Sequence, residues 1–387
     1  MIKVQVGEGV FEENQLVPDR IDAGIGRIGG SHAGTRVIPY LRKEAKGDGA
    51  RKLKDEVQFL LRLPQDIAEK FPRVIRYYAS PSAVAMEQEF VQLPTLRKIL
   101  CEGEATAGEG IEWVKRILDF LFSRVYSREA RIPPDDYLEQ LHFLRAWARF
   151  AETMSKAPLF EGIILADRIY VQGEECYNAP QILRVMEEDA ELHRILRPSK
   201  VSPFVHGDLH FDNILVSRDT RSFKLVDPRG YEYCDPWYDA GKLYHSARGK
   251  YDLIHRGEFR VDWTVEEQGR VEIDLKFYST PAYHKYQEIS ENLEGLLMQY
   301  APEENVAMLS LFNEAIHFIS DMPFHLSRDE KEAKAVAIYG TGVWLLNRLL
   351  KDHCPNRIAA VAEQSGRIAA ERIGRASHWK FQGNAAA

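Results

Sequence analysis

The sequence predicts an α+β protein with a small N-terminal lobe and a larger, mostly helical C-terminal lobe. Its length of 387 residues exceeds what one small core needs and suits two lobes. Residues 21–100 are rich in glycine and short β-like runs, whereas amphipathic helical patterns dominate from about residue 110 onward. Between them, residues 103–110 (Gly-Glu-Ala-Thr-Ala-Gly-Glu-Gly) are small, polar and typical of a boundary. We therefore assign residues 1–105 to the first lobe and residues 106–387 to the second.

The composition is ordinary for a globular protein, because 45% of the residues are hydrophobic and 28% are charged. The net charge of −7 argues against a broad nucleic-acid-binding face. The four cysteines form no Cys-x-x-Cys pair, so we expect reduced thiols rather than a disulfide framework or a zinc site. The N-terminal residues lack a signal-peptide core, and no run of about eighteen apolar residues occurs. We expect a cytoplasmic protein that binds neither nucleic acid nor membranes.

Two short motifs in the C-terminal lobe are the most informative part of the sequence. The first is His-Gly-Asp-Leu-His-Phe-Asp-Asn at residues 206–213, and the second is Asp-Pro-Arg-Gly at residues 227–230. Apolar runs at residues 214–216 and 223–226 lie between the motifs and are separated by turn-forming residues. The sequence therefore predicts a β-hairpin whose open end carries both motifs.

The predicted hairpin brings Asp208, Asn213 and Asp227 to one end. Phosphoryl transfer from ATP needs such a set, namely a carboxylate near the acceptor hydroxyl and two oxygen ligands for Mg²⁺. The alternative is that these residues only form turns and helix caps, which Asp and Asn favour. That alternative suits a lone His-x-Asp better than it suits the full eight-residue motif with Asp227 at this distance.

The first motif matches the His-Arg-Asp-Leu-x-x-x-Asn catalytic loop of protein kinases, with Gly207 in place of arginine. It more closely resembles the loop of the aminoglycoside phosphotransferase and choline kinase group of small-molecule kinases, which reads His-Gly-Asp, four residues and Asn. This resemblance implies a bilobal protein-kinase-like fold with a small antiparallel sheet in the N-terminal lobe. It also implies that Asp208 is the catalytic base, that Asn213 and Asp227 hold magnesium, and that His206 braces the loop.

Residues 24–35 form a glycine-rich stretch in front of a predicted strand. A glycine-rich turn lets backbone N–H groups approach a phosphate closely, because no Cβ intervenes. The stretch lacks the Gly-Lys-Ser/Thr of a Walker loop, and by itself a purely structural hairpin is the simpler interpretation. Because it lies upstream of a kinase-like catalytic loop, we interpret Gly29, Gly30, Ser31 and Gly34 as the phosphate cover of an ATP site.

A kinase of this kind also needs a strand lysine that contacts the ATP phosphates. Lys43 and Arg42 both close the strand after the glycine-rich stretch, and they point to opposite faces of it. We favour Lys43, because the apolar Leu41 shares its face and suits the adenine side. Pro39 leaves the strand register open, so Arg42 remains the alternative.

The lysine in turn needs a helix glutamate that holds it in place. Apolar residues recur with helical spacing over residues 53–63, and Glu56 on this predicted helix is the candidate partner. A solvated surface glutamate is the alternative. A further strand precedes Thr95, which is a candidate N-cap for the next helix. The resemblance implies a hinge there, whose backbone groups at about Glu89 and Val91 bind the adenine edge.

Helical patterns in the C-terminal lobe cover residues 111–121, 135–156 and 181–196. Beyond the second motif, Asp235 is a candidate N-cap for a further helix. The resemblance implies that Asp239 starts this helix region and bonds the catalytic loop, in a structural role rather than as a metal ligand.

Arg229 and Arg248 are candidates for substrate binding. Arg229 can pair with a phosphate or carboxylate of the substrate, or simply with a neighbouring acidic side chain. Aminoglycosides demand an acidic site and choline demands aromatic walls, whereas this lobe also offers the basic residues Arg229, Lys242, Arg248 and Lys250. An anionic or neutral acceptor such as a sugar therefore fits at least as well.

The sequence predicts a kinase that moves the γ-phosphoryl group of ATP, with Mg²⁺, to a hydroxyl group of a small polar molecule. A sugar, an aminoglycoside or an amino alcohol meets this description. A protein kinase is one alternative, but no activation segment ending in Ala-Pro-Glu is recognisable. A non-catalytic, nucleotide-binding scaffold is the other, which the intact set of Asp208, Asn213 and Asp227 disfavours. The identity of the acceptor and the oligomeric state stay open.

Overall fold

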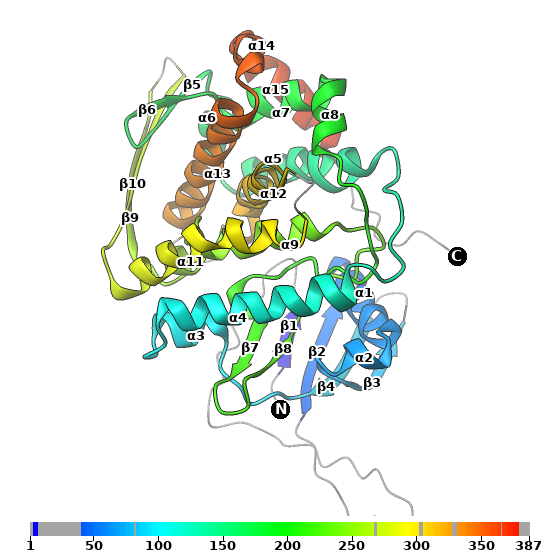
Figure 1. Cartoon of the computed structure of the whole chain (residues 1–387). Coiled ribbons are helices and arrows are strands. Elements are labelled where there is room, and N and C mark those ends of the chain that lie inside the picture. The colour runs from blue at the N-terminus through cyan, green and yellow to red at the C-terminus, as the bar shows by residue number, and fades with distance from the viewer. Residues whose placement is uncertain are drawn as a thin grey trace, which may run out of the picture.

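The computed structural model describes residues 3–6, 40–80, 83–266, 269–301, 305–326, 331–364 and 366–378. These ranges form an α+β protein in which a smaller, sheet-bearing lobe lies against a larger and mostly helical lobe (Figure 1). The predicted fold class is therefore confirmed. Within the described ranges, every helix is too short or too polar to cross a lipid bilayer.

The N-terminal lobe is built on a four-stranded sheet with the strand order β1-β2-β4-β3. Its strands are β1 (Lys3–Val6), β2 (Tyr40–Lys46), β3 (Val74–Ala79) and β4 (Ala83–Glu89). Strands β2 and β3 both pair antiparallel with β4, as expected, whereas β1 joins the edge parallel to β2. The alternation of β2 buries Lys43 and Ala45 and leaves Arg42 and Glu44 on the other face.

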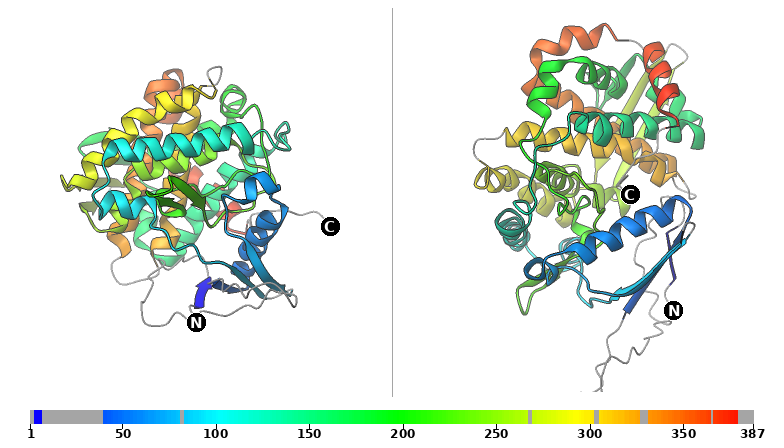
Figure 2. Two further views of the ribbon diagram at one scale, coloured as in Figure 1. Left: turned by 60° about the horizontal axis from the view of Figure 1, so that its bottom comes forward. Right: turned by 90° about the vertical axis from the view of Figure 1, so that its right-hand side faces the viewer.

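Helix α1 (Asp48–Arg62) packs on this sheet through an apolar stripe that includes the buried Leu53 and Val57. The helix begins earlier than the predicted range of 53–63. Gly47, with a φ of 57°, lets the chain turn directly from β2 into the helix. In the right-hand view of Figure 2, α1 lies between the sheet and the larger lobe. Side chains on α1 can therefore face groups of the C-terminal lobe.

The C-terminal lobe consists mainly of helices, and α12 packs against both α9 and α13. The helices and helical turns, together with the short α2 of the first lobe, are α2 (Gln65–Ala68), α3 (Leu96–Cys101), α4 (Ala107–Phe120), η1 (Leu121–Val125), η2 (Glu139–Phe143), α5 (Leu144–Lys156), α6 (Leu159–Ile164), α7 (Ala179–Glu188), α8 (Ala190–Leu196), η3 (Phe211–Asn213), α9 (Pro236–Ala247), α10 (Tyr251–His255), α11 (Pro281–Met298), α12 (Val306–Asp321), η4 (Met322–His325), α13 (Lys331–His353), η5 (Pro355–Arg357), α14 (Ile358–Ala362) and α15 (Gly366–Ala376).

Two of the predicted helices differ from the structure. The helix predicted over residues 181–196 is divided into α7 and α8, because the Asp189 carboxylate accepts the N–H groups of Glu191 and Leu192 and caps a new helix. The helix predicted over residues 135–156 includes the π-helical turn η2 before α5 begins. Both differences are local interruptions of a helical pattern that the sequence shows correctly.

The predicted β-hairpin between the two motifs is present as β7 (Ile214–Ser217) and β8 (Ser222–Leu225). A second sheet, with the order β6-β5-β10-β9, is absent from the sequence prediction. Its strands are β5 (Arg168–Val171), β6 (Glu174–Cys176), β9 (Phe259–Val265) and β10 (Arg270–Phe277). Strand β10 buries Val271, Ile273 and Leu275 on one face. The alternation of apolar and polar residues in β10 is visible in the sequence. It was missed because helical segments surround it on both sides.

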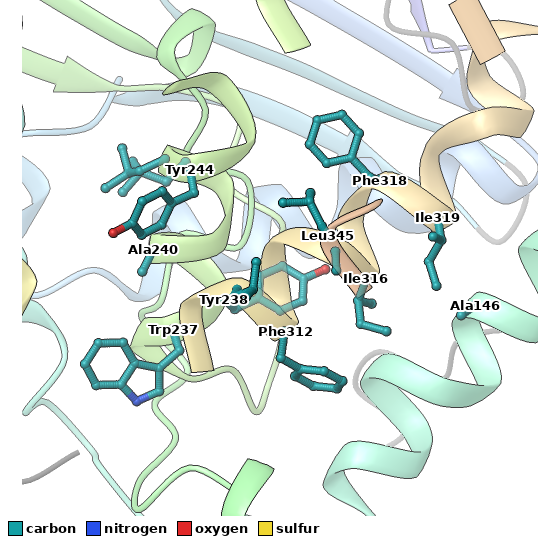
Figure 3. Packing of buried hydrophobic residues seen from close by; sticks show 14 of the residues in the cluster. Ala146, Trp237, Tyr238, Ala240, Tyr244, Phe312, Ile316, Phe318, Ile319 and Leu345 are labelled. Carbon is teal, nitrogen blue, oxygen red and sulfur yellow. The ribbon is translucent and has the colours of Figure 1, made fainter. Parts of the chain in front are cut away.

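Helix α9 lies at the centre of the helical lobe, and its residues 237–247 are all buried. Figure 3 shows aromatic side chains of α9, including Tyr238, beside apolar side chains of α12, including Phe312. The two helices approach most closely at Gly241, where an added Cβ would lie 2.6 Å from the Asn313 Cβ and 2.9 Å from the Asn313 backbone carbonyl carbon. The missing side chain of Gly241 therefore sets the position of α9.

Gly241→Ala is expected to destabilise the fold by about 1–3 kcal/mol, because the added methyl group would force α9 and α12 apart. Gly295→Ala in α11 is the matched control, since nothing lies within 4 Å of a Cβ added there. The higher helix propensity of alanine should stabilise that variant by up to about 1 kcal/mol. Urea unfolding followed by circular dichroism measures both free energies. Equal effects of the two substitutions would contradict the close packing of α9 on α12.

Candidate active site

Asp239 of α9 supports the loop formed by residues 206–213. Its carboxylate accepts the backbone N–H of His206 at 3.0 Å, the backbone N–H of Gly207 at 2.8 Å and the hydroxyl of Tyr126 at 2.9 Å. Burial raises the pKa of Asp239 to about 7, and the three hydrogen-bond donors act against this rise. The hydrogen bonds to the loop that the family resemblance implied are therefore present.

His206 connects the two motifs. Its Nε2–H donates to the Val226 carbonyl at 2.8 Å, and its Nδ1 accepts the backbone N–H of Asp208 at 3.2 Å. Burial lowers the pKa of His206 to about 4, so the ring is neutral at physiological pH and carries its proton on Nε2. Gly207, with a φ of 78°, provides the left-handed turn that this bracing requires. The first motif is thereby fixed against the residue that precedes Asp227.

Asn213 is oriented by a hydrogen bond from its Nδ2 to the Asp208 carbonyl, at 2.9 Å. Its own backbone carbonyl accepts the N–H of Val226 at 3.0 Å. A side-chain amide has one acceptor atom, and the bond through Nδ2 leaves Oδ1 as the atom that can bind a metal ion. The start of the hairpin therefore presents an oxygen donor next to Asp208.

Asp208 is buried and surrounded by cations. Its Oδ2 forms an ion pair with Arg229, and its Oδ1 lies 3.2 Å from Lys242 Nζ. Burial alone would raise the pKa of Asp208, but Arg229 and Lys242 hold it well below its usual value. Among the described residues, no donor completes a hydrogen bond to Oδ1. Asp208 is thus an ionised carboxylate with one oxygen open to a further proton donor.

A second group of charges joins the two lobes. Lys43 is only 2% exposed; its ammonium lies 2.6 Å from Glu56 Oε1 and also forms an ion pair with Asp227. Burial alone would lower the pKa of Lys43, but the two carboxylates raise it above its usual value. Burial raises the pKa of Glu56 to about 7, and Lys43 acts against that rise. The structure therefore brings together three of the residues proposed from sequence.

Arg42, the alternative to Lys43, lies on the other face of β2. Its guanidinium binds Glu87 at 2.9 Å and also contacts Glu44. Lys43 rather than Arg42 is therefore the residue beside Asp227. Asp227 itself has a φ of 59°, a left-handed conformation that is unusual for a residue other than glycine and is often found at functional sites.

The last residue of the second motif, Gly230, has to be a glycine for two structural reasons. Gly230 has a φ of 67°, and a Cβ added there would overlap the backbone carbonyl of Asp55 in α1. The loop at residues 227–230 therefore runs directly against α1 of the other lobe. Any larger residue would push this loop away from α1 and Asp227 away from Lys43 of the N-terminal lobe.

The oxygen atoms of Asn213 and Asp227 fit a magnesium ion shared with nucleotide phosphates. Both residues adjoin the paired end of the hairpin, where Ile214 lies opposite Leu225. Mg²⁺ in phosphoryl-transfer sites takes one or two protein oxygens and fills its remaining positions with phosphate and water. Within the described part of the chain, no group of three or more His, Cys, Asp or Glu residues forms a metal cage. Two protein oxygens of this kind match the small number that Mg²⁺ takes in a phosphoryl-transfer site.

For the other ATP-site residues predicted from the sequence, the structure gives a position only in part. Gly29, Gly30, Ser31 and Gly34 lie outside the described residues. Glu89 ends β4, and its N–H donates to the Arg73 carbonyl at 2.8 Å.

The rest of the predicted hinge follows β4. The Val91 carbonyl accepts the N–H of Leu93 at 2.9 Å. Thr95 caps α3 by accepting the N–H of Lys98, as predicted. Both Glu89 and Val91 therefore lie in the connection from the sheet to the helical lobe, where the hinge was proposed.

The structure separates the two substrate candidates. Arg229 lies at Asp208, whereas Arg248 forms an ion pair with the buried Glu314 and stacks over the Tyr244 ring at 4.2 Å. None of the contacts of Arg248 reaches Asp208. Substrate binding by Arg248 therefore stays a prediction, and its ion pair shows that Arg248 also neutralises a buried carboxylate of the helical core.

Sequence reasoning missed several charged residues that the fold brings to Asp208 or to its neighbours. Lys242 was noted only as a basic residue, and Asp321 of α12 lies 3.5 Å from its ammonium. Arg145 and Arg149 were overlooked on α5, where only the apolar stripe was considered. Their spacing of four residues places them on one helix face, which is the signal that could have identified them.

Asp239→Asn is expected to destabilise the protein by about 1–3 kcal/mol, because the amide NH₂ would face a backbone N–H that now has an acceptor. Thermal or urea unfolding measures the loss. The control is Asp352→Asn, which removes only a surface ion pair with Arg348 at 3.4 Å and should change stability by less than about 0.5 kcal/mol. A loss at Asp239 no larger than that of the control would show that the loop does not depend on this carboxylate.

Comparison with known proteins adds one positive finding. The chain matches no curated protein. The family model described as APH, the phosphotransferase enzyme family, matches residues 41–288, which is more than half of the chain and includes Lys43, Glu56, Asp208, Asn213 and Asp227. This family covers kinase-like enzymes of the aminoglycoside phosphotransferase and choline kinase type and has a protein-kinase-like fold. The chain therefore belongs to the APH phosphotransferase family.

Proposed function

We propose that this protein transfers the γ-phosphoryl group of ATP, with the aid of Mg²⁺, to a hydroxyl group of a small polar molecule. A sugar, an aminoglycoside or an amino alcohol would meet this description. The observation that carries the proposal is the convergence of Lys43, Glu56 and Asp227 with Asp208 and Asn213 around one end of the hairpin. These groups come from four separate stretches of the chain and supply the parts that phosphoryl transfer requires.

On the nucleotide side, Lys43 would bind the phosphates and Glu56 would fix its ammonium. Both side chains are buried, so the charge of Lys43 is held in one place before any phosphate arrives. Asn213 Oδ1 and the Asp227 carboxylate would hold Mg²⁺, which neutralises charge on the phosphate oxygens. Most of the rate enhancement in such a reaction comes from positioning and charge neutralisation.

On the acceptor side, Asp208 would receive the proton of the attacking hydroxyl. Its ionised state and the open Oδ1 support this role. Arg229 and Lys242 keep the carboxylate charged, and His206 and Asn213 fix the backbone on either side of it. The base is therefore held in the protonation state and orientation that accepting a proton requires.

Two further observations support an acceptor of small size and a cytoplasmic location. Only residues 228–235 lie between Asp227 and the start of α9, which leaves little room for the activation segment of a protein kinase. The four cysteines, at positions 101, 176, 234 and 354, are free thiols, as is usual in a reducing compartment. A protein substrate and a purely non-catalytic role are therefore the less favoured alternatives.

Acceptor-dependent release of ADP from Mg·ATP should be detectable in a screen of sugars, sugar acids, amino alcohols, aminoglycosides and nucleosides, and EDTA should abolish it. Asp208→Asn should lower kcat by roughly 10²-fold or more while leaving nucleotide binding intact. Turnover that survives Asp208→Asn at the wild-type rate would contradict the proposed role of this carboxylate.

Lys43→Met should lower kcat/KM for ATP by roughly 10²-fold or more, because the buried phosphate-binding charge is lost. Arg42→Met is the matched control on the opposite face of the same strand. Its partner Glu87 keeps a second ion pair with Arg76, so this variant should retain kcat/KM within a few-fold. A similar loss in both variants would point to damage of the sheet instead of loss of a phosphate contact. Circular dichroism of both variants checks the fold.

A further inference from the structure

Five cationic side chains lie near Asp208, Asp321 and Phe324, and we call them the basic cluster. The basic cluster comprises Lys52 of α1, Arg145 and Arg149 of α5, Arg229 of the second motif, and Lys242 of α9. They come from three helices and a loop that are distant in sequence. Their assembly is therefore a property of the fold and not of one basic stretch of the chain.

Shared neighbours define the cluster. Lys52 and Arg149 lie over the same Phe324 ring, with distances of 5.1 Å and 4.5 Å to its centroid. Lys242 lies near Asp321, whose charge also acts on Arg145 and Arg229. Phe324 thus joins two of the cations and Asp321 joins the other three, and the charge of Arg229 acts on Lys52 and connects the two sets.

The positive charges outnumber the negative ones. Among the described residues, the carboxylates that act on the cluster through ion pairs are Asp208, Asp321 and Glu152, so three anions face five cations. The excess of positive charge affects Lys52. Burial, together with the positive charges of Arg229 and Arg149, lowers the pKa of Lys52 to about 8. Such an excess is unfavourable unless an anion is bound there for part of the time.

Arg145 is the member that points most clearly to a ligand. Its Nη1 donates to the Tyr238 hydroxyl, whereas its Nε and Nη2 groups are buried and find no hydrogen-bond partner within the described chain. It also forms no ion pair with a described carboxylate. A buried guanidinium with unsatisfied donors is costly, and a carboxylate or phosphate oxygen is the acceptor that suits it best.

Nucleotide phosphates are a poor explanation for Arg145. The groups proposed to bind them are Lys43, Glu56 and Asp227, and none of the contacts of Arg145 involves these residues. Arg145 instead interacts with Tyr238 and Asp321, on the helical lobe. Its unsatisfied donors are therefore better explained by the second substrate.

We propose that the acceptor is an anion, a hydroxylated small molecule whose carboxylate or phosphate group binds Arg145 within the basic cluster. This inference rests on the proposed kinase function. The hydroxyl oxygen of the acceptor forms a bond to the γ-phosphorus as the bond from that phosphorus to the bridging oxygen of ADP breaks. The hydroxyl proton passes to Asp208 and then to solvent, so the products are ADP, the phosphorylated anion and a proton.

A binding experiment tests the site without knowledge of the natural acceptor. Saturating Mg²⁺ and a non-hydrolysable ATP analogue first fill the nucleotide site, and thermal unfolding is then followed against inorganic phosphate or malonate at constant ionic strength. At least one anion should raise the unfolding midpoint of the wild-type protein, and the two arms separate phosphate from carboxylate recognition. Arg145→Met should weaken this apparent affinity by roughly tenfold or more, and Arg145→Lys should weaken it less.

Arg348→Met is the matched control, because Arg348 is a half-exposed arginine on α13 whose ion pair with Asp352 lies on the surface. It should bind the anions like the wild-type protein. Circular dichroism of Arg145→Met, together with its affinity for the ATP analogue, checks that the fold is intact. Absence of protection by both anions, or protection that Arg145→Met leaves unchanged, overturns the inference.

Turnover provides a second and independent measurement. Glucose, glucosamine, gluconate and glucose 6-phosphate form a series of neutral, cationic, carboxylated and phosphorylated polyols. One of the two anions should give the highest kcat/KM, and Arg145→Met should lower that value while leaving the KM for ATP unchanged. A preference for glucose or glucosamine overturns the inference but leaves the kinase function standing. Failure to bind the ATP analogue, with no turnover of any acceptor, instead counts against the kinase function itself and overturns the inference along with it.

Discussion

A buried ion pair between the lobes is the interaction on which the rest of the site depends. Lys43 extends from the N-terminal sheet to Asp227 of the helical lobe, while Glu56 of α1 holds the same ammonium. Removing one partner of such a pair leaves an uncompensated charge at a cost of roughly 3–5 kcal/mol. The relative position of the lobes and the position of a proposed metal ligand are therefore set by the same three side chains. The glycine at 230, which lets the following loop touch α1, adds a steric constraint of the same kind.

Hydrogen bonds to the backbone organise the loop that carries Asp208. Asp239 binds two consecutive N–H groups of the loop, and His206 joins the loop to the residue before Asp227. Because Asp239 and His206 make these bonds, the side chain of Asp208 is not needed to hold the loop. Its ion pairs with Arg229 and Lys242 keep it charged. Membership of the APH phosphotransferase family is consistent with this arrangement. Asp239 and His206 thus hold the loop in place, and neither is proposed to react itself.

Much of this could be predicted because the informative residues are close in sequence. The first motif, the hairpin and the second motif occupy one short stretch, and strand alternation was enough to favour Lys43 over Arg42. The cations on α5 and α1 could not be recognised, because they come together only through tertiary packing and resemble solvated helix faces in the sequence. The second sheet was missed since its alternation lies among helices, and the break at Asp189 was missed since a capping aspartate also fits a polar helix face.

Helices α9 and α5 differ in how many of their side chains can be exchanged without disturbing the packing. Helix α9 is buried along almost its whole length, and one of its turns carries both Asp239 and Lys242, so a shift of one residue would rotate both groups out of place. Helix α5 supplies Arg145 and Arg149 from one face while its other side packs in the core. If Arg145 binds the acceptor as proposed, new acceptor preferences can arise over evolutionary time by exchanging side chains on a single face of α5, while α9 stays unchanged.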